Sequence, residues 1–244
     1  MNPLPKLDAI WVYLAATPLL GLTLTLVAYL IAINVYTRFR FNPLANPVLI
    51  AVAIVVLALK VSDTPYKTYF EGAQFVHFLL GPATVALALP LYRQWPKLKR
   101  TALPLVGGLV AGSLAAIGSA VGIAALFGAS RQTLASIAPK SATTPIAMAV
   151  ADRIGGIPSL TAVLVISTGV FGAVTARGIL RMLRVEELEV RGFAIGVAAH
   201  GIGTARAFQV SEEMGAFAGL GMGLNGVFTA FVVPVLPPVL LRWL

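Results

Sequence analysis

A run of polar residues at 139–146, Pro-Lys-Ser-Ala-Thr-Thr-Pro-Ile, interrupts an apolar stretch of the chain. Thr144 followed by Pro145 is typical of a helix start, because a threonine side chain caps free amides and proline fits the first helical position. Pro139 should end any helix that precedes it. A helix N-terminus carries about half a positive charge and suits an anion. The residues that this segment offers to an anion are Lys140, Ser141, Thr143 and Thr144.

Lys140 adds a full positive charge one turn from that helix end. If the apolar stretch lies in a bilayer, a lysine at its centre costs about 2.5–3.5 kcal/mol and requires water, a partner or an anionic ligand. The competing interpretation is an interfacial loop lysine that reaches water and binds nothing. The density of serine and threonine beside Lys140 favours a binding site.

A second interruption lies at 200–206, His-Gly-Ile-Gly-Thr-Ala-Arg. Gly201 and Gly203 free backbone groups that must line a cavity or pack against protein. Thr204 is a candidate cap for a second half-helix. Arg206 offers a planar fork of donors that suits a carboxylate. This segment therefore predicts a second part of the same anion site.

The imidazole of a histidine ordinarily changes charge near neutral pH, so His200 is a candidate for proton coupling, as are Asp152 and Glu213. The alternative for His200 is a structural hydrogen bond. The alternative for Arg206 is a salt bridge to Asp152, Glu212 or Glu213.

Two weaker candidates complete the predicted substrate site. Thr84 follows a Gly-Pro pair that should kink an apolar helix, so a packing role is as good an interpretation as binding. Asn225 is a polar residue inside the last apolar stretch, where interhelical hydrogen bonding competes with substrate binding.

Composition places these segments in a membrane. The chain is 58% hydrophobic and 11% charged, whereas soluble domains average about 45–50% and about 25%. In lipid the backbone must satisfy its own hydrogen bonds, and long apolar runs favour helices over the short alternating strands of a barrel. We therefore predict an all-α, polytopic helical membrane protein.

Six stretches are long and apolar enough to cross roughly 30 Å of hydrocarbon. Residues 133–153 and 190–210 are of similar length but interrupted. The prediction is therefore about six full spans plus two broken or re-entrant helices, with eight crossings as the upper limit. Residues 1–244 should form one membrane domain, with two spans in 1–71 and the core in 72–244. The six stretches are about 9–37, 46–62, 72–92, 101–127, 157–176 and 214–241.

The formal net charge of +9 comes from short basic clusters between spans, which is the pattern of cytoplasmic loops. No basic stretch is interleaved with aromatic residues, so nucleic-acid binding is not expected. Residues 93–100 hold the densest cluster and should face the cytoplasm. The arginines at 177–184 fall on the same side only if 133–153 is re-entrant.

The chain has no cysteine and two histidines, so we expect no thiolate chemistry, dedicated metal site or cofactor. No nucleophile elbow, His-Glu-x-x-His pair or phosphate loop occurs, and we expect no enzyme activity. Three short segments, 81–84, 141–144 and 201–204, recur at offsets of sixty and each contain Thr at the fourth position. They indicate either an internal repeat, as in many transporters, or a coincidence among common residues.

From about Tyr69 to Leu241 the chain resembles the LrgB/CidB family of bacterial membrane proteins. The matching segments are Leu-Gly-Pro-Ala-Thr-Val-Ala-Leu-Ala-Leu-Pro-Leu-Tyr at 80–92, Pro-Lys-Ser-Ala-Thr-Thr-Pro-Ile-Ala at 139–147, Gly-Gly-Ile-Pro at 155–158, Ala-His-Gly-Ile-Gly-Thr-Ala-Arg-Ala at 199–207 and Gly-Met-Gly-Leu-Asn-Gly at 221–226.

The resemblance implies a multi-pass protein of the bacterial plasma (inner) membrane, with two competing functions. One is antiholin-like control of murein hydrolase export and autolysis with a small LrgA/CidA-type membrane partner. The other is secondary transport, because chloroplast relatives exchange glycolate and glycerate and some bacterial members are linked to pyruvate uptake. The cationic, threonine-rich segments favour transport of a small monocarboxylate of the glycolate, glycerate, pyruvate or lactate type. The substrate, the coupling ion and any homo-oligomer stay open.

Overall fold

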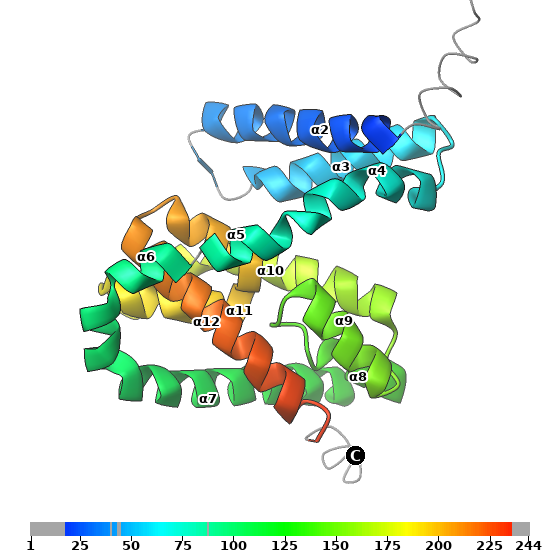
Figure 1. The fold of residues 1–244 in the computed structure, drawn as a ribbon. Coiled ribbons are helices and arrows are strands. Elements are labelled where there is room, and N and C mark those ends of the chain that lie inside the picture. Colours follow the sequence, from blue (N-terminus) through cyan, green and yellow to red (C-terminus); the bar gives the residue numbers. More distant parts are fainter. Residues whose placement is uncertain (1–17, 40, 43–44, 87, 236–244) are drawn as a thin grey trace, which may run out of the picture. The chain divides into compact units, whose positions relative to one another are not determined.

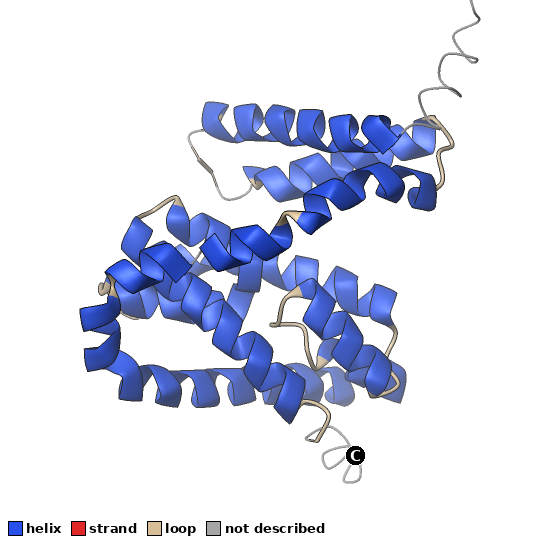
Figure 2. Ribbon diagram, viewed as in Figure 1, coloured by secondary structure: helices blue, strands red, loops and turns tan. Residues whose placement is uncertain are grey.

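The computed structural model describes residues 18–39, 41–42, 45–86 and 88–235. Its regular elements are helices, and no strand occurs among these residues (Figure 2), which confirms the all-α prediction. The first residues of the expected span at 9–37 and the last of that at 214–241 lie outside the described part. Contacts divide the chain into two compact units, Met1–Ala86 and Leu87–Leu244. We describe each unit separately.

The described part of the first unit contains four helices, in which α2 packs against α3 and α4. A Cβ added to Gly21 of α2 would lie 2.3 Å from the main-chain oxygen of Tyr69 in α4, so only glycine permits this approach. The hydroxyls of Thr25 and Tyr69 are hydrogen-bonded at 2.8 Å. Asn46 caps α3 by accepting the Val48 amide at 2.9 Å. The bounds are α2 Pro18–Arg38, α3 Pro47–Val61, α4 Tyr66–Phe78 and α5 Leu80–Ala86.

The expected span at 72–92 is not one helix. It is divided among α4, α5 and a further helix α6 (Ala88–Arg93). Pro82 lacks an amide hydrogen and clashes with the preceding turn. The Leu79 amide instead bonds the Val76 carbonyl three residues back, which closes α4 tightly. Thr84 lies in α5, but its side chain is outside the described part of the structure.

Four described helices are long and apolar enough to span a membrane: Leu19–Arg38, Trp95–Leu126, Pro158–Met182 and Glu212–Val232. The apolar helix α3 has only 15 residues, or about 22 Å, which is less than the roughly 30 Å of a hydrocarbon core. The protein is therefore a helical membrane protein in which fewer described segments reach spanning length than the sequence predicts.

The second unit is built on three long helices, α7 (Trp95–Leu126), α10 (Pro158–Met182) and α12 (Glu212–Val232) (Figure 1). The helices α7 and α12 run in the same direction. Leu105 in the first half of α7 shares an apolar cluster with Phe217 near the start of α12, whereas Val121 and Val233 toward the C-terminal ends of the two helices share another. The helix α10 runs the opposite way, because Leu180 near its end packs beside the start of α12.

A helical hairpin lies at the C-terminal end of α7. It consists of α8 (Arg131–Ile137), a turn at 138–143 and α9 (Thr144–Arg153). Leu134 of α8 and Val150 of α9 pack in the same cluster as Val121. Ser136 Oγ accepts the Ile157 amide at 2.8 Å, which fixes α8 to the start of α10. Both arms are too short to cross a bilayer, so this segment is re-entrant.

A second hairpin, α11 (Leu188–Phe208), lies at the other end of α7. Its helix breaks at Ala199 and at His200, where φ is 40° and ψ is −134°. Both ends of α11 lie near Lys97. The Lys97 Nζ is 2.8 Å from Glu189 at the start of α11. It also pairs with Glu213, five residues after the end of α11. The second interrupted segment is therefore also re-entrant, from the opposite end of the unit.

The two arms of α11 pack closely because the positions between them lack side chains. A Cβ on Gly203 of the second arm would lie 2.7 Å from Ile195 Cγ2 of the first. The first arm also runs along α12, where a Cβ on Gly196 would lie 2.0 Å from the Ala218 oxygen. Such small-residue contacts let membrane helices approach closely. The glycines thus fix the shape of the hairpin.

Candidate anion site at the two hairpin tips

The tip of the first hairpin is a tight turn. Its Lys140 amide bonds the Ile137 carbonyl at 3.1 Å, and the Ala142 amide bonds the Pro139 carbonyl at 3.0 Å. Lys140 is half-buried, and its Nζ lies 3.3 Å from the hydroxyl of buried Ser141. Pro139 ends the preceding helix region as predicted. The turn therefore carries an ammonium group and a hydroxyl into the interior of the unit.

The predicted helix start at Thr144 is confirmed, but the capping residue is the one before it. Thr143 is the N-cap, with φ −64° and ψ 147°, and Thr144 is the first helical residue. The Thr143 side chain makes no capping hydrogen bond, because the prolyl nitrogen of Pro145 removes one of the amides that it would cap. In the described structure the amides of Thr144 and Ile146 donate no hydrogen bond. This helix end keeps donors available beside Lys140.

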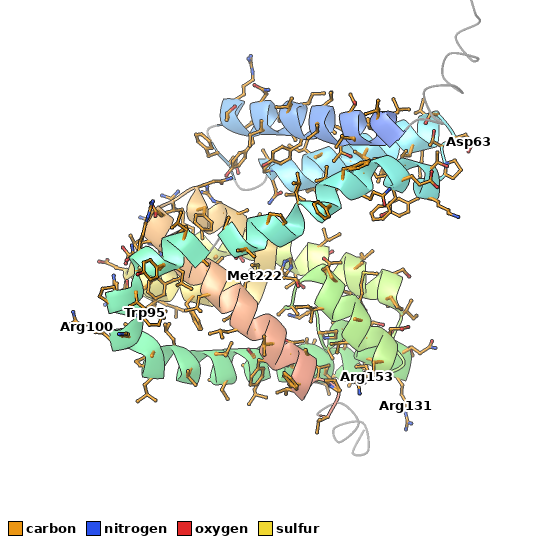
Figure 3. All side chains as sticks on the ribbon, viewed as in Figure 1. Asp63, Trp95, Arg100, Arg131, Arg153 and Met222 are labelled. Carbon is orange, nitrogen blue, oxygen red and sulfur yellow. The ribbon has the colours of Figure 1, made fainter. Side chains whose placement is uncertain are left out.

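The tip of the second hairpin is His200, whose side chain is buried. Its Nε2 donates to the main-chain carbonyl of Val165 in α10 at 2.9 Å. The predicted role of Thr204 as a helix cap is wrong, because the break lies four residues earlier. Thr204 instead donates its hydroxyl to the His200 carbonyl at 2.8 Å, and it lies 3.8 Å from the Sδ of Met222, labelled in Figure 3.

Glycine in α10 makes room for the imidazole ring. A Cβ on Gly169 would lie 2.6 Å from His200 Cε1 and 2.8 Å from Nε2. Any larger residue would displace the ring and its hydrogen bond to Val165. The structure thus holds the His200 ring with α10 on one side and the hairpin on the other.

Asn225, in the middle of α12, joins both tips. Its Nδ2 donates to the Ser141 carbonyl at 3.0 Å and to the Val197 carbonyl at 3.1 Å. Its Oδ1 accepts the hydroxyl of Ser113 in α7 at 2.7 Å. Both amide hydrogens are therefore used by the protein. Asn225 therefore positions the two tips. This is the interhelical hydrogen bonding that was the alternative to substrate binding for this residue.

The site residues fall into a central group and outlying residues. The Val165 carbonyl bonds the His200 ring, and the Val165 side chain shares an apolar cluster with Ala142 in the Lys140 turn. Asn225 links the same turn to the arm before His200. Gly201 follows the break directly, and a Cβ there would meet only Met222 Sδ at 3.9 Å. Gly203 is occupied with packing between the hairpin arms. The central group is Lys140, Ser141, Thr143, Thr144, His200, Gly201 and Asn225.

Three predicted residues lie away from this group. Arg206 is in the last turn of α11, where its Nη1 donates to Gln209 Oε1 at 3.0 Å. Glu213 pairs with Lys97 at the base of the second hairpin. Asp152 is exposed near the end of α9. Of the three candidates for proton coupling, only His200 therefore belongs to the central group.

Some contributing residues carry no signal in the sequence. Ser113 lies within a long apolar helix, and Gly169 is one of many glycines. Val165 binds the His200 ring through its carbonyl oxygen, a group that every residue carries. Their roles come from contacts with distant segments, which a local pattern does not encode.

Together these features define a helical membrane protein with two re-entrant hairpins that meet at a polar centre. The model of the LrgB-like family matches residues 25–239. The chain belongs to this family, which confirms the resemblance found in the sequence. No solved structure matches the chain.

Curated relatives cover nearly the whole chain. Uncharacterized protein YxaC of Bacillus subtilis is 35% identical over 221 residues, which are 91% of this chain and 96% of the relative. Holin-like protein CidB of Staphylococcus epidermidis is 31% identical over 217 residues, 89% of this chain and 94% of the relative. Antiholin-like protein LrgB of Bacillus mycoides is 31% identical over 222 residues, 91% and 96% of the two chains.

Proposed function

We propose that this protein is a secondary transporter of small monocarboxylates of the glycolate, glycerate, pyruvate or lactate type, located in the bacterial plasma membrane. One observation carries the proposal. Lys140 lies half-buried at the tip of a re-entrant hairpin, beside a helix N-terminus with available amides, and Asn225 joins this tip to the second hairpin.

The chemistry of this centre suits a carboxylate. A carboxylate that leaves water loses its hydration and needs fixed donors in exchange. Lys140 supplies a charge, and the amides of Thr144 and Ile146 supply donors at the positive end of α9. The hydroxyls of Thr143 and Thr144 are close in sequence to these donors and suit the 2-hydroxy or 2-oxo group. An uncharged solute would leave the Lys140 charge uncompensated.

The arrangement of the hairpins suits alternating access. Broken helices that meet near the centre of a membrane protein are typical of secondary transporters with inverted repeats. Here α7 with the first hairpin and the antiparallel α10 with the second form two similar helix–hairpin units. The segments 141–144 and 201–204, separated by sixty residues, lie at or directly after the two tips. Movement of either hairpin would open the centre toward one side.

Proton coupling would run through His200 in this account. The ring lies near Lys140, and its Nε2 hydrogen is held by the Val165 carbonyl. A proton on Nδ1 would add a second positive charge next to the anion. Binding of the carboxylate would then favour proton uptake, which links the two fluxes.

The second candidate function is antiholin-like regulation of murein hydrolase export and autolysis, with a small LrgA/CidA-type membrane partner. The names of the relatives CidB and LrgB favour this candidate over transport, whereas the polar centre favours transport. A regulator that only binds a partner gains nothing from a half-buried lysine beside open helix amides.

Reconstitution separates the two candidates. The purified chain alone is placed in liposomes, and uptake of labelled glycolate and pyruvate is followed with and without an inward proton gradient. A transporter accumulates one of these acids in the absence of any partner, and the excess unlabelled acid competes. Uptake equal to that of empty liposomes for the whole acid series contradicts transport and leaves the regulatory function.

A further inference from the structure

An apolar groove lies between α7 and the first arm of α11, inside the second unit. Its volume is about 310 Å³. On α7 it runs from Thr101 past Gly108 and Gly112 to Ala116, and on α11 from Glu189 to Ala198. From Thr101 to Ala116 the α7 wall rises about 22 Å. That length exceeds the roughly 15 Å of hydrocarbon in one leaflet.

The groove is too narrow to hold another helix, as its volume and length together show. The whole space between the walls, its open side included, is about 830 Å³. Over that length the mean cross-section is at most about 37 Å², whereas a helix about 10 Å in diameter needs about 80 Å². The missing side chains of the two glycines on α7 create the space. A Cβ on Gly108 would meet nothing within 4 Å, and one on Gly112 would meet only Val197 Cγ1 at 3.7 Å. The groove thus has room for a single extended hydrocarbon chain.

The polar end of the groove carries positive charge. Glu189 at this end is already paired with Lys97 at 2.8 Å. Arg100 lies one helical turn before Pro104 and is exposed, and Lys99 lies 5.2 Å from the Trp95 ring. In the described part of the chain no acid pairs with Arg100 or Lys99. Tryptophan and lysine together are typical of the membrane–water interface.

We propose that this groove is a binding site for an anionic phospholipid. One acyl chain lies along α7 from Thr101 to Ala116, and the phosphate binds at Arg100, with Lys99 adding to the local positive charge. Basic residues at the mouth of an interhelical groove bind anionic headgroups in the same way. The site is separate from the anion centre at the hairpin tips, and the inference does not depend on the proposed transport function.

Thermal unfolding of the detergent-purified chain tests the site, with phosphatidylglycerol as the probe and phosphatidylcholine as the neutral comparison. Native mass spectrometry counts the bound lipids in the same samples. Gly108→Leu fills the groove. Gly107→Leu is the matched control, because a Cβ there also meets nothing within 4 Å but Gly107 does not line the groove. Arg100→Gln removes the headgroup contact, with Arg131→Gln as its control.

We expect phosphatidylglycerol to raise the melting temperature of the wild type and of Gly107→Leu more than phosphatidylcholine does. Gly108→Leu should lose at least half of that shift. Arg100→Gln should weaken phosphatidylglycerol binding about fivefold, the effect of one basic residue near a headgroup. Equal responses to the two lipids overturn the proposal. The proposal is also overturned if Gly108→Leu responds normally to phosphatidylglycerol but changes the oligomeric state. That result would show that a helix of another copy occupies the groove.

Discussion

Asn225 donates its side-chain amide to the main-chain carbonyl of Ser141 over 3.0 Å. This bond ties the middle of α12 to the tip of the first hairpin. The second hydrogen of the same amide binds the Val197 carbonyl in the second hairpin, and Ser113 of α7 binds the side-chain oxygen. One buried side chain therefore sets the spacing between the two tips that would enclose an anion.

Replacing Asn225 with leucine, which has a similar volume, should destabilise the fold and abolish anion binding together. Two buried carbonyls lose their donor, and each unpaired group costs roughly 1–3 kcal/mol. We expect a lower melting temperature in detergent and no ligand-induced shift with glycolate. The matched control is Asn34→Leu, because Asn34 is exposed and its side-chain amide bonds the Leu30 carbonyl of its own helix. Unchanged stability of Asn225→Leu would contradict the positioning role.

Gly169→Ala should disturb the second tip without removing any polar group. The new methyl group would lie 2.6 Å from the His200 ring, so the ring must move and its bond to Val165 must lengthen or break. We expect proton-coupled uptake to fall at least tenfold while the protein still folds. Gly178→Ala on the same helix meets nothing within 4 Å and should behave as wild type. Equal uptake by both variants would show that the His200 position is irrelevant to transport.

The sequence predicts where the helices break better than it predicts which distant residues these breaks bring together. Pro139 and the Thr-Pro pair after it act locally, so the gap between α8 and α9 and the start of α9 near Thr144 could be predicted. The second break was expected around the glycines after His200 but placed too late, because the positive φ at His200 is set by packing against α10 and α12.

The partners of Asn225 could not be predicted from the sequence. Its bonds join residues 84 and 112 positions away, and no local pattern encodes such distances. The direction of the hairpins is a similar case. The charge pattern did not distinguish a full crossing from a re-entrant form for either interrupted segment. The apolar clusters at the two ends of α7 favour the re-entrant form.

The ion pairs of Lys97 should stabilise the base of the second hairpin modestly. The lysine side chain is 40% exposed and the Glu189 side chain 13% exposed, and partly exposed pairs contribute about 0–1 kcal/mol each. We expect Lys97→Gln to lower the melting temperature more than Arg93→Gln. Arg93 makes its one described pair with Glu212, and both side chains are more than half exposed. High salt should reduce the difference. An equal effect of the two substitutions would contradict the closure of the hairpin base by Lys97.

The re-entrant hairpins predict which loops share a side of the membrane. The chain contains no cysteine, so single cysteines can be labelled without a background. In the view of Figure 3, Arg131 and Arg153 lie at the end of the second unit opposite Trp95 and Arg100. We expect Gln94→Cys and Arg184→Cys to react only after the cytoplasmic side is opened. Arg131→Cys and Arg153→Cys should react from outside intact cells. Labelling of Gln94→Cys from outside, or of residues 131 and 153 from different sides, would contradict this topology.

Equilibrium binding of labelled glycolate and pyruvate to the purified protein shows whether Lys140 forms an anion site. Lys140→Gln removes the half-buried charge at the first tip, and a charge-assisted hydrogen bond contributes roughly 1.5–3 kcal/mol. We therefore predict that Lys140→Gln binds the acid about tenfold to a hundredfold more weakly while melting at nearly the wild-type temperature. Lys67→Gln, an exposed lysine in the first unit, should bind normally, and Arg206→Gln should change binding less than Lys140→Gln because Arg206 bonds Gln209 outside the tips. Wild-type affinity in a folded Lys140→Gln protein would contradict the proposed anion site.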